Sequence, residues 1–190
     1  MNHLGTVILE TERLILRPFT LEDAPAMYTN WAGDSEVTRH LTWPTHDSAA
    51  VSRAILADWV PLYEKPDYYH WAIVLRDLGE PMGSIGAVKV NDSVEMAEIG
   101  YCIGQRWWHQ GYTSEALGAV IGFLFGQVGM NRIQAYHDVQ NPHSGDVMAK
   151  CGMVCEGTLR QGARSNQGLT DVALRAILKR DWVGQERPRP

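Results

Sequence analysis

The stretch Glu98–Leu117 (EIGYCIGQRWWHQGYTSEAL) constrains this chain most, because it predicts a strand, a glycine turn and a helix in direct succession. Its first part, 98–103, mixes apolar and β-forming residues in a run short enough for a buried or half-buried strand. After the turn, apolar residues recur at intervals of three and four, which is typical of one face of an amphipathic helix. These residues are Ala116, Leu117, Val120, Ile121, Leu124 and Val128.

Gly111 lies at the start of the predicted helix. A helix N-terminus carries unpaired N–H groups and the positive end of the helix dipole, so it suits an anion such as a phosphate or pyrophosphate. Because Gly111 has no side chain, the backbone N–H groups of His109 to Ser114 can approach such a ligand closely. Junctions of this kind also occur as plain connections, and the pattern alone leaves both interpretations open.

The length and composition are typical of a globular protein with one hydrophobic core: 190 residues, 45% hydrophobic and 21% charged. We expect one domain over residues 1–183 and a flexible tail over residues 184–190. No apolar run reaches the roughly 18 residues that a membrane span needs, and the first residues lack the basic-then-apolar pattern of a secretory signal. The expected location is cytoplasmic, without a membrane partner.

Charge and metal-ligand patterns limit the kinds of ligand and partner that the chain is expected to bind. The formal charge of −5 argues against a sequence-independent contact with nucleic acid and suits a cationic or amine substrate better. The three cysteines Cys102, Cys151 and Cys155 lack CxxC spacing and predict free thiols. The seven histidines include no HExxH pattern, so we expect no metal site.

The rest of the chain predicts short strands and further helices. Three successive strands with short turns indicate an antiparallel meander, and the strand after the long helix is expected to lie parallel to a neighbour. The loop Gly33–Thr45 has no clear period and carries His40 and Trp43; such loops often line a substrate pocket. The predicted strands are Val7–Arg17, Trp71–Leu75, Gly83–Val90, Val94–Ile103, Arg132–His137, Met153–Arg160 and Leu169–Leu178, and the predicted helices begin near Thr20, Asp47, Tyr112 and Asn141.

Three segments, taken together, resemble the GNAT superfamily of acetyl-coenzyme A-dependent N-acetyltransferases. They are the opening ETERLILRPFTLEDA, the central AEIGYCIGQRWWHQGYTSEAL and the later VQNPHSGDVMAKCGMVCEGTLRQ. Their order and spacing are similar to the branch that includes the ribosomal-protein N-terminal (Rim-type) acetyltransferases. The resemblance implies an α/β (α+β) GNAT fold, with a central mixed, mostly antiparallel sheet of six to seven strands flanked by about four helices.

The resemblance also implies where acetyl-coenzyme A binds as a co-substrate. The pyrophosphate loop of the family has the form Gln/Arg-x-x-Gly-x-Gly/Ala, and it corresponds here to Trp108–Thr113, where the first and last fixed positions differ. The backbone of Tyr101, Cys102 and Ile103 is expected to pair with the pantetheine arm as an added strand would. Since backbone donors make most of the contacts in such loops, we expect phosphate binding at His109, Gln110, Gly111, Tyr112, Thr113 and Ser114.

Direct acetyl transfer needs a neutral amine, a polarised carbonyl and a proton for the departing thiolate. By the resemblance, Ser144 hydrogen-bonds or protonates this thiolate, and Asn141 binds the pantetheine or fixes the loop; both are also ordinary helix-capping residues. Glu98 is the candidate base, although a β-bulge would turn it to the other face of the sheet. Some relatives carry a base after the Glu-Gly pair, but Ala163 occupies that position here, and a solvent base stays open.

Two classes of function remain open from the sequence. One is an N-acetyltransferase acting on a protein N-terminal amine or on a small-molecule amine such as a polyamine, amino acid or aminoglycoside. The other is a non-catalytic acyl-coenzyme A binding or sensing protein, whereas a Rossmann dinucleotide protein fits poorly because GxGxxG is missing. The oligomeric state stays open, with a homodimer as one option. The tryptophans Trp31, Trp43, Trp71, Trp107 and Trp108 either line an amine pocket through cation–π contacts or belong to the core.

Overall fold

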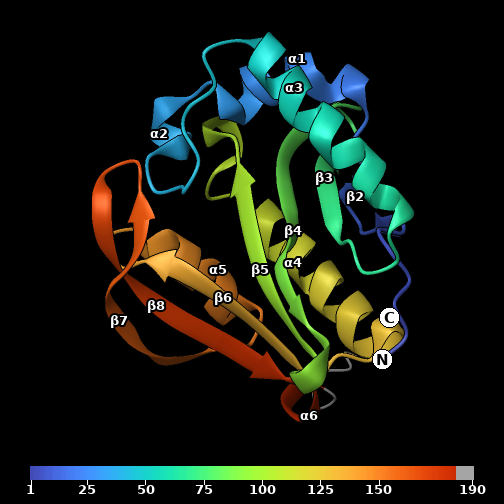
Figure 1. Ribbon diagram of the computed structural model, residues 1–190, viewed down its shortest axis with the longest axis vertical. Coiled ribbons are helices and arrows are strands. Elements are labelled where there is room, and N and C mark those ends of the chain that lie inside the picture. The colour runs from blue at the N-terminus through green and yellow to red at the C-terminus, as the bar shows by residue number, and fades with distance from the viewer. Residues whose placement is uncertain (183–190) are drawn as a thin grey trace.

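The computed structural model describes residues 1–182 and builds them around one eight-stranded sheet (Figure 1). Neighbouring strands follow the order β1-β2-β3-β4-β5-β6-β8-β7, and all pairs are antiparallel except β5 and β6, which are parallel. The predicted tail 184–190 lies outside the described residues. The strands are β1 Leu9–Glu10, β2 Leu14–Arg17, β3 His70–Leu75, β4 Pro81–Asn91, β5 Met96–Ile103, β6 Arg132–Asp138, β7 Val154–Ser165 and β8 Gly168–Leu178.

The predicted fold class, a mixed and mostly antiparallel sheet with flanking helices, is confirmed. The sheet has eight strands in place of six to seven because the predicted strand Val7–Arg17 is interrupted by a turn. Within this turn Thr11 N donates to Leu14 O at 3.0 Å, and Leu14 N donates to Thr11 Oγ1 at 2.9 Å. The chain therefore folds back as the antiparallel pair β1 and β2.

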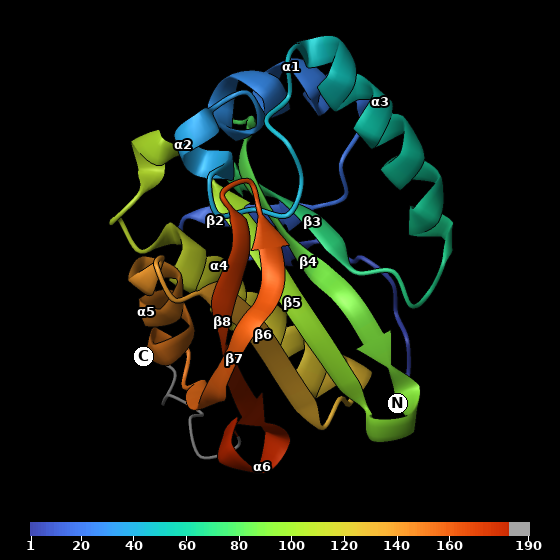
Figure 2. The same ribbon diagram turned by 60° about the vertical axis from the view of Figure 1, so that its left-hand side comes forward.

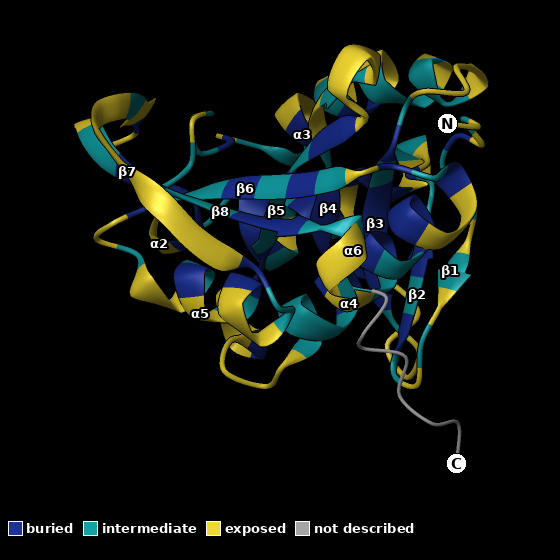
Figure 3. Ribbon diagram, turned by 90° about the horizontal axis from the view of Figure 1, so that it is seen from below, coloured by how far each residue is buried: buried dark blue, intermediate teal, exposed yellow. Residues whose placement is uncertain are grey.

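Helices cover both faces of the sheet. Figure 3 views the sheet edge-on, with α3 on one side and α4 and α5 on the other. The four-residue helices α2 and α6 raise the number above the predicted four, and α2 lies in the predicted loop 33–45 (Figure 2). Within residues 1–182, no helix combines the length and apolar character that crossing a membrane requires. The helices are α1 Ala24–Met27, α2 Ser35–Thr38, α3 Ala49–Trp59, α4 Tyr112–Phe123, α5 Pro142–Lys150 and α6 Lys179–Trp182.

Each face of the sheet has its own hydrophobic core. On the α4 face, all six residues of the predicted apolar stripe, Ala116 to Val128, are at most 1% exposed. On the α3 face, Phe19, Trp31 and Leu56 pack against Val74. Burying a large apolar side chain contributes about 1.5–3 kcal/mol. The two cores thus fix helices firmly on both sides of the strands that carry the site.

Strands β5 and β6 diverge after a short paired segment, as Figure 1 shows. Only Met96, Ala97 and Glu98 of β5 have partners on β6, namely Arg132, Ile133 and Gln134. On its other edge β5 stays paired with β4, with a bulge between Ala87 and Lys89 opposite Glu98. The edge of β5 from Ile99 to Ile103 therefore faces an opening in the sheet.

Candidate active site

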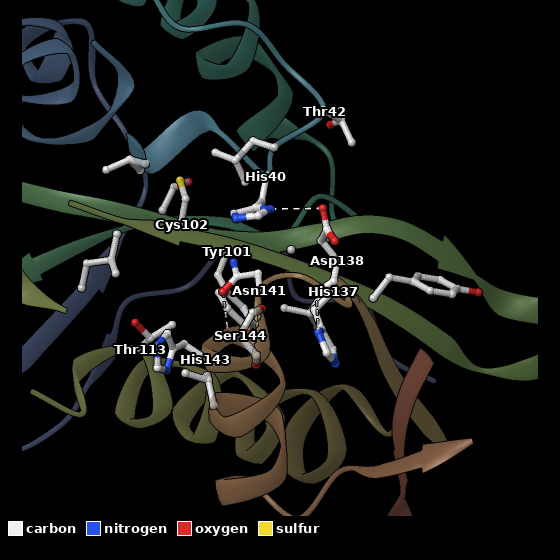
Figure 4. Close-up of a pocket in the computed structure, with 18 of the residues that line it drawn as sticks. His40, Thr42, Tyr101, Cys102, Thr113, His137, Asp138, Asn141, His143 and Ser144 are labelled. Atoms are coloured by element: carbon white, nitrogen blue, oxygen red, sulfur yellow. Dashed lines mark hydrogen bonds and ion pairs between the residues drawn. The ribbon is translucent and has the colours of Figure 1, made fainter. Parts of the chain in front are cut away.

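A cavity of about 1160 Å³ occupies the opening between β5 and β6 (Figure 4). It is lined by residues on both faces of the sheet, and we call these the α4 side and the α3 side of the opening. Side chains alternate along a strand, so Tyr101 belongs with the core on the α4 side, whereas Glu98 and Cys102 point to the α3 side. In Figure 4, His40 and Cys102 accordingly lie on the opposite side of the strands from Ser144.

The predicted phosphate loop lies at one end of this cavity on the α4 side. Its backbone takes positive φ angles at His109 (60°) and Gly111 (81°), and α4 begins directly afterwards, with Glu115 N donating to Gly111 O at 3.0 Å. None of the backbone N–H groups from His109 to Ser114 donates a hydrogen bond within residues 1–182. A row of free donors at the positive end of a helix can bind an anion without rearrangement.

Arg13 and Glu115 hold this loop against the turn between β1 and β2. The Glu115 carboxylate accepts hydrogen bonds from Thr11 Oγ1 (2.6 Å) and from the backbone N–H (3.0 Å) and Nε (2.7 Å) of Arg13. Burial alone would raise the pKa of Glu115, but these hydrogen bonds outweigh it and lower the pKa below its usual value. Arg13 also donates to Gln110 O and stacks over the Tyr112 ring.

The predicted loop residues therefore divide into two groups. Gln110 and Tyr112 contact Arg13 and do not line the cavity, so only their backbone N–H groups are offered to a ligand. The residues that line the cavity are His109, Gly111, Thr113 and Ser114. The His109 ring packs edge-on against His143 of α5, with 4.7 Å between ring centroids.

Tyr101 and Ser144 meet on the α4 side. The Tyr101 hydroxyl lies 3.1 Å from Ser144 Oγ and donates to Ser144 O at 2.8 Å. Burial raises the pKa of Tyr101, so its hydroxyl stays protonated. Asn141 caps α5, since its Oδ1 accepts from Ser144 N. The Asn141 side chain thus acts as a helix cap, whereas the Ser144 hydroxyl has a single hydrogen-bond partner within residues 1–182, the Tyr101 hydroxyl.

The candidate base Glu98 and the thiol of Cys102 face the α3 side. The Glu98 carboxylate lines the cavity and accepts a hydrogen bond from Gln134 Nε2 at 3.0 Å. Cys102 lies 3.4 Å from Ser84 Oγ, and burial raises its pKa, which argues against a nucleophilic role. Ala163 of β7 also lines the cavity, so the position where some relatives carry a base offers only a methyl group.

The tryptophans belong partly to the core and partly to the cavity wall. Trp31 and Trp71 are fully buried, and Trp71 Nε1 donates to Val7 O, so Trp71 is a core residue. Trp43 and Trp108 are partly exposed and line the cavity, together with Trp59, which the sequence did not single out.

The sequence did not reveal a pair of side chains on the α3 side, His40 and Asp138. His40 Nδ1 lies 3.1 Å from Asp138 Oδ2, and both residues line the cavity (Figure 4). In the sequence, the only signal for His40 is its place in the aperiodic loop 33–45. For Asp138, the only signal in the sequence is its place directly after the predicted strand 132–137, which is expected to lie parallel to a neighbour.

Fold and site together define a class of protein. A family model described as an acetyltransferase (GNAT) domain matches residues 13–154. The chain belongs to this family, and the predicted enzyme class, an N-acetyltransferase, is confirmed.

Individual relatives agree with this assignment. The chain is 34% identical to the uncharacterized N-acetyltransferase YoaA of Bacillus subtilis over 90% of this chain and 97% of that protein. It is 32% identical to the [ribosomal protein uS5]-alanine N-acetyltransferase of Escherichia coli, with 96% of each chain covered. A solved structure of RimL, a ribosomal L7/L12 α-N-protein acetyltransferase in complex with coenzyme A, has the same fold, with a TM-score of 0.81 at 20% identity over 90% of this chain and 98% of that chain.

Proposed function

We propose that this protein transfers an acetyl group from acetyl-coenzyme A to a primary amine by direct attack in a ternary complex. The observation that carries the proposal is the row of free N–H groups from His109 to Ser114 at one end of the cavity. A diphosphate is an anion with several acceptor oxygens, and such a group suits a row of N–H donors at a helix N-terminus. The edge of β5 from Ile99 to Ile103, which has no partner on β6, fits an arm that carries amide groups.

The acceptor approaches from the α3 side in this proposal. The carboxylates of Glu36, Glu98 and Asp138 line that part of the cavity and outnumber its two guanidinium groups, those of Arg39 and Arg164. This excess of negative charge favours a cationic amine. Two substrate classes fit: a protein N-terminus, as in the name of the Escherichia coli relative, and a small-molecule amine. A cytoplasmic location belongs to the same proposal.

The residues of the chain have separate tasks in this reaction. Acetyl-coenzyme A supplies an acyl group activated as a thioester. The Ser144 hydroxyl, held by Tyr101, donates a proton to the departing sulfur. Asn141 fixes the start of α5 and thereby the position of Ser144. Glu98 attracts the ammonium form of the acceptor and assists its deprotonation.

Replacing Ser144 with Ala tests the proposal. The cap of α5 survives, because Asn141 accepts from the backbone N–H of Ser144 and not from its hydroxyl. Thiol release with a panel of primary amines is expected to fall roughly 100-fold in kcat, with little change in the Kd for acetyl-coenzyme A. Ser93→Ala, in the turn between β4 and β5 and outside the cavity, is the matched control. An unaltered kcat in Ser144→Ala would contradict the role of Ser144.

A further inference from the structure

A histidine and a carboxylate face the cavity from the α3 side, opposite Ser144 (Figure 4). His40 follows α2, and Asp138 ends β6, so the fold joins residues that are 98 positions apart. The side chain of Asp138 is 3% exposed and that of His40 is 20% exposed. The carboxylate is thus enclosed, while the ring reaches the cavity.

Asp138 is held as an ionised carboxylate. Its Oδ1 accepts from Gln140 N at 2.8 Å, and its Oδ2 faces His40 Nδ1. Burial alone would raise the pKa of Asp138, but the hydrogen bonds from the Gln140 N–H group and from His40 outweigh it and lower the pKa. A carboxylate can only accept, so it fixes the tautomer with hydrogen on Nδ1. The lone pair of His40 is then on Nε2, which has no hydrogen-bond partner within residues 1–182.

The loop that carries His40 is also fixed in place. Asn166, at the tip of the β7–β8 hairpin, donates through Nδ2 to Thr38 O and Trp43 O, both at 2.8 Å. Its backbone N–H donates to Leu41 O at 3.1 Å. Three hydrogen bonds therefore hold the carbonyl groups on both sides of His40, and the ring is presented to the cavity from a defined position.

We propose that His40 is the catalytic residue that accepts a proton from the acceptor amine, and that Asp138 is its positioning residue. The inference rests on the proposed function and adds the group that activates the amine. An ammonium nitrogen gives one proton to His40 Nε2, and the lone pair left on nitrogen forms the C–N bond to the acetyl carbon. The C–S bond breaks, and its electron pair leaves with sulfur. Sulfur takes a proton from Ser144, nitrogen loses its second proton to solvent, and Ser144 regains a proton from solvent. His40 then releases its own proton to solvent, so that one proton is released overall for each ammonium acetylated.

Other ionisable groups line the cavity on the same side as His40. The Glu98 carboxylate accepts one hydrogen bond from Gln134, and Nε2 of His40 has no partner within residues 1–182. A neutral imidazole is in general a stronger base than a carboxylate, so His40 takes the proton, while Glu98 attracts the cationic amine and assists the deprotonation. The remaining ionisable side chains that line the cavity on the α3 side are Glu36, Arg39, Tyr68, His70, Cys102, Tyr136 and Arg164.

The test is His40→Asn, because an Asn amide can still donate to Asp138 while the accepting nitrogen is lost. Thiol release is followed with acetyl-coenzyme A and a tripeptide amine, spermidine and a free amino acid, using the amine with the highest kcat/KM. At neutral pH kcat/KM is expected to fall about 100-fold, and the deficit shrinks as pH rises because more of the amine is then neutral. Added imidazole is expected to restore part of the rate in His40→Ala.

The chain offers a matched control in a second histidine–aspartate pair. His3 Nε2 lies 3.3 Å from Asp92 Oδ1, away from the cavity, and His3→Asn is expected to leave both the rate and its pH profile unchanged. Asp138→Asn is expected to lower kcat and alter the pH profile without changing the Kd for acetyl-coenzyme A, whereas a merely structural role would lower the rate equally at every pH.

The outcomes separate the two proposals. A wild-type rate in His40→Asn would overturn the role of His40 while leaving acetyl transfer intact. The same holds if the deficit of His40→Asn is equal at every pH and imidazole does not restore the rate of His40→Ala. A larger and pH-dependent loss in Glu98→Gln than in His40→Asn would reassign the proton acceptor to Glu98. Wild-type protein that bound acetyl-coenzyme A but released no thiol with any of the amines would overturn the proposed function and the role of His40 together.

Discussion

The two sides of the opening between β5 and β6 are built in different ways. The α4 side uses backbone groups from one continuous stretch, in which the donors of His109 to Ser114 follow directly after β5. The α3 side uses side chains from distant segments, among them His40, His70 and Asp138, and its loop is held by Asn166. A site made of main chain depends on local conformation, whereas a site made of side chains depends on how the whole sheet assembles. Substitutions should therefore affect the two sides through different causes.

The largest expected effect comes from Gly111→Val, which tests the dependence of the α4 side on backbone conformation. A β-branched residue is strongly disfavoured at the observed φ of 81°, so the loop and the first turn of α4 must shift. We expect a loss of roughly 3 kcal/mol in acetyl-coenzyme A binding, or about 100-fold in Kd, measured by calorimetry.

Gly118→Ala in the same helix is the control for Gly111→Val. A Cβ at Gly118 meets no atom within 4 Å, so this variant is expected to bind acetyl-coenzyme A normally and to be slightly more stable, by up to about 1 kcal/mol. Equal affinities of Gly111→Val and wild type would show that the α4 side does not depend on this turn.

On the α3 side, His70 is expected to have a smaller effect, which is a loss of folding stability at acidic pH. Its ring packs against Trp59 and Phe19, and burial lowers the pKa of His70 to about 4. The unfolded chain binds this proton near pH 6.5, so the unfolded state carries more protons between about pH 6.5 and pH 4. The stability supplied by the neutral ring is therefore present above that window and is lost as pH falls through it, by roughly 2 kcal/mol for a ring that the cavity partly exposes.

His70→Phe keeps an aromatic ring and removes the titration. Urea unfolding at pH 7 and pH 5 is expected to show a smaller drop in the variant than in wild type, although the variant loses the contact between His70 Nδ1 and the Tyr68 hydroxyl at both pH values. Identical pH dependence in the two proteins would exclude His70 as the source.

The smallest expected effect is that of Asn166→Asp, which sharpens the contrast between the two sides. A carboxylate cannot donate to Thr38 O and Trp43 O and repels both, so the loop that carries His40 loosens. We expect KM for the amine to rise several-fold, corresponding to about 1 kcal/mol, while the Kd for acetyl-coenzyme A stays the same. A change in cofactor affinity of the same size would show that the two sides are not independent.

The same contrast explains what the sequence could predict of the site. The phosphate loop could be predicted because the strand, glycine and helix that would form it are adjacent in the chain. The N–H groups of His109 to Ser114 donate no hydrogen bond within residues 1–182, and phosphate binding there stays a prediction. The pair His40 and Asp138 could not be predicted because neither residue belongs to a local pattern. They meet only when the loop after α2 packs beside the end of β6, where Asn166 of the β7–β8 hairpin holds that loop. The roles of Ser144, Asn141 and Glu98 stay predictions.

More of the fold than of the site could be predicted from the sequence. Periodicity identified the buried face of α4 completely, since a helix that packs on a sheet must keep one apolar stripe. The division of 7–17 into two strands was missed, because the turn depends on Thr11 Oγ1 accepting from Leu14 N and not on a glycine or proline. The parity of Glu98 became clear only with the bulge between Ala87 and Lys89 and the alternation along β5.

The opening is bordered from both faces of the sheet, and this has a consequence for turnover kinetics. If the two reactants enter the cavity from opposite faces, neither blocks the entrance of the other. Binding then has no obligatory order. Initial-velocity lines measured at several fixed concentrations of one reactant are then expected to intersect. With this arrangement, the acetylated product is expected to be released from the α3 side while coenzyme A is still bound on the α4 side.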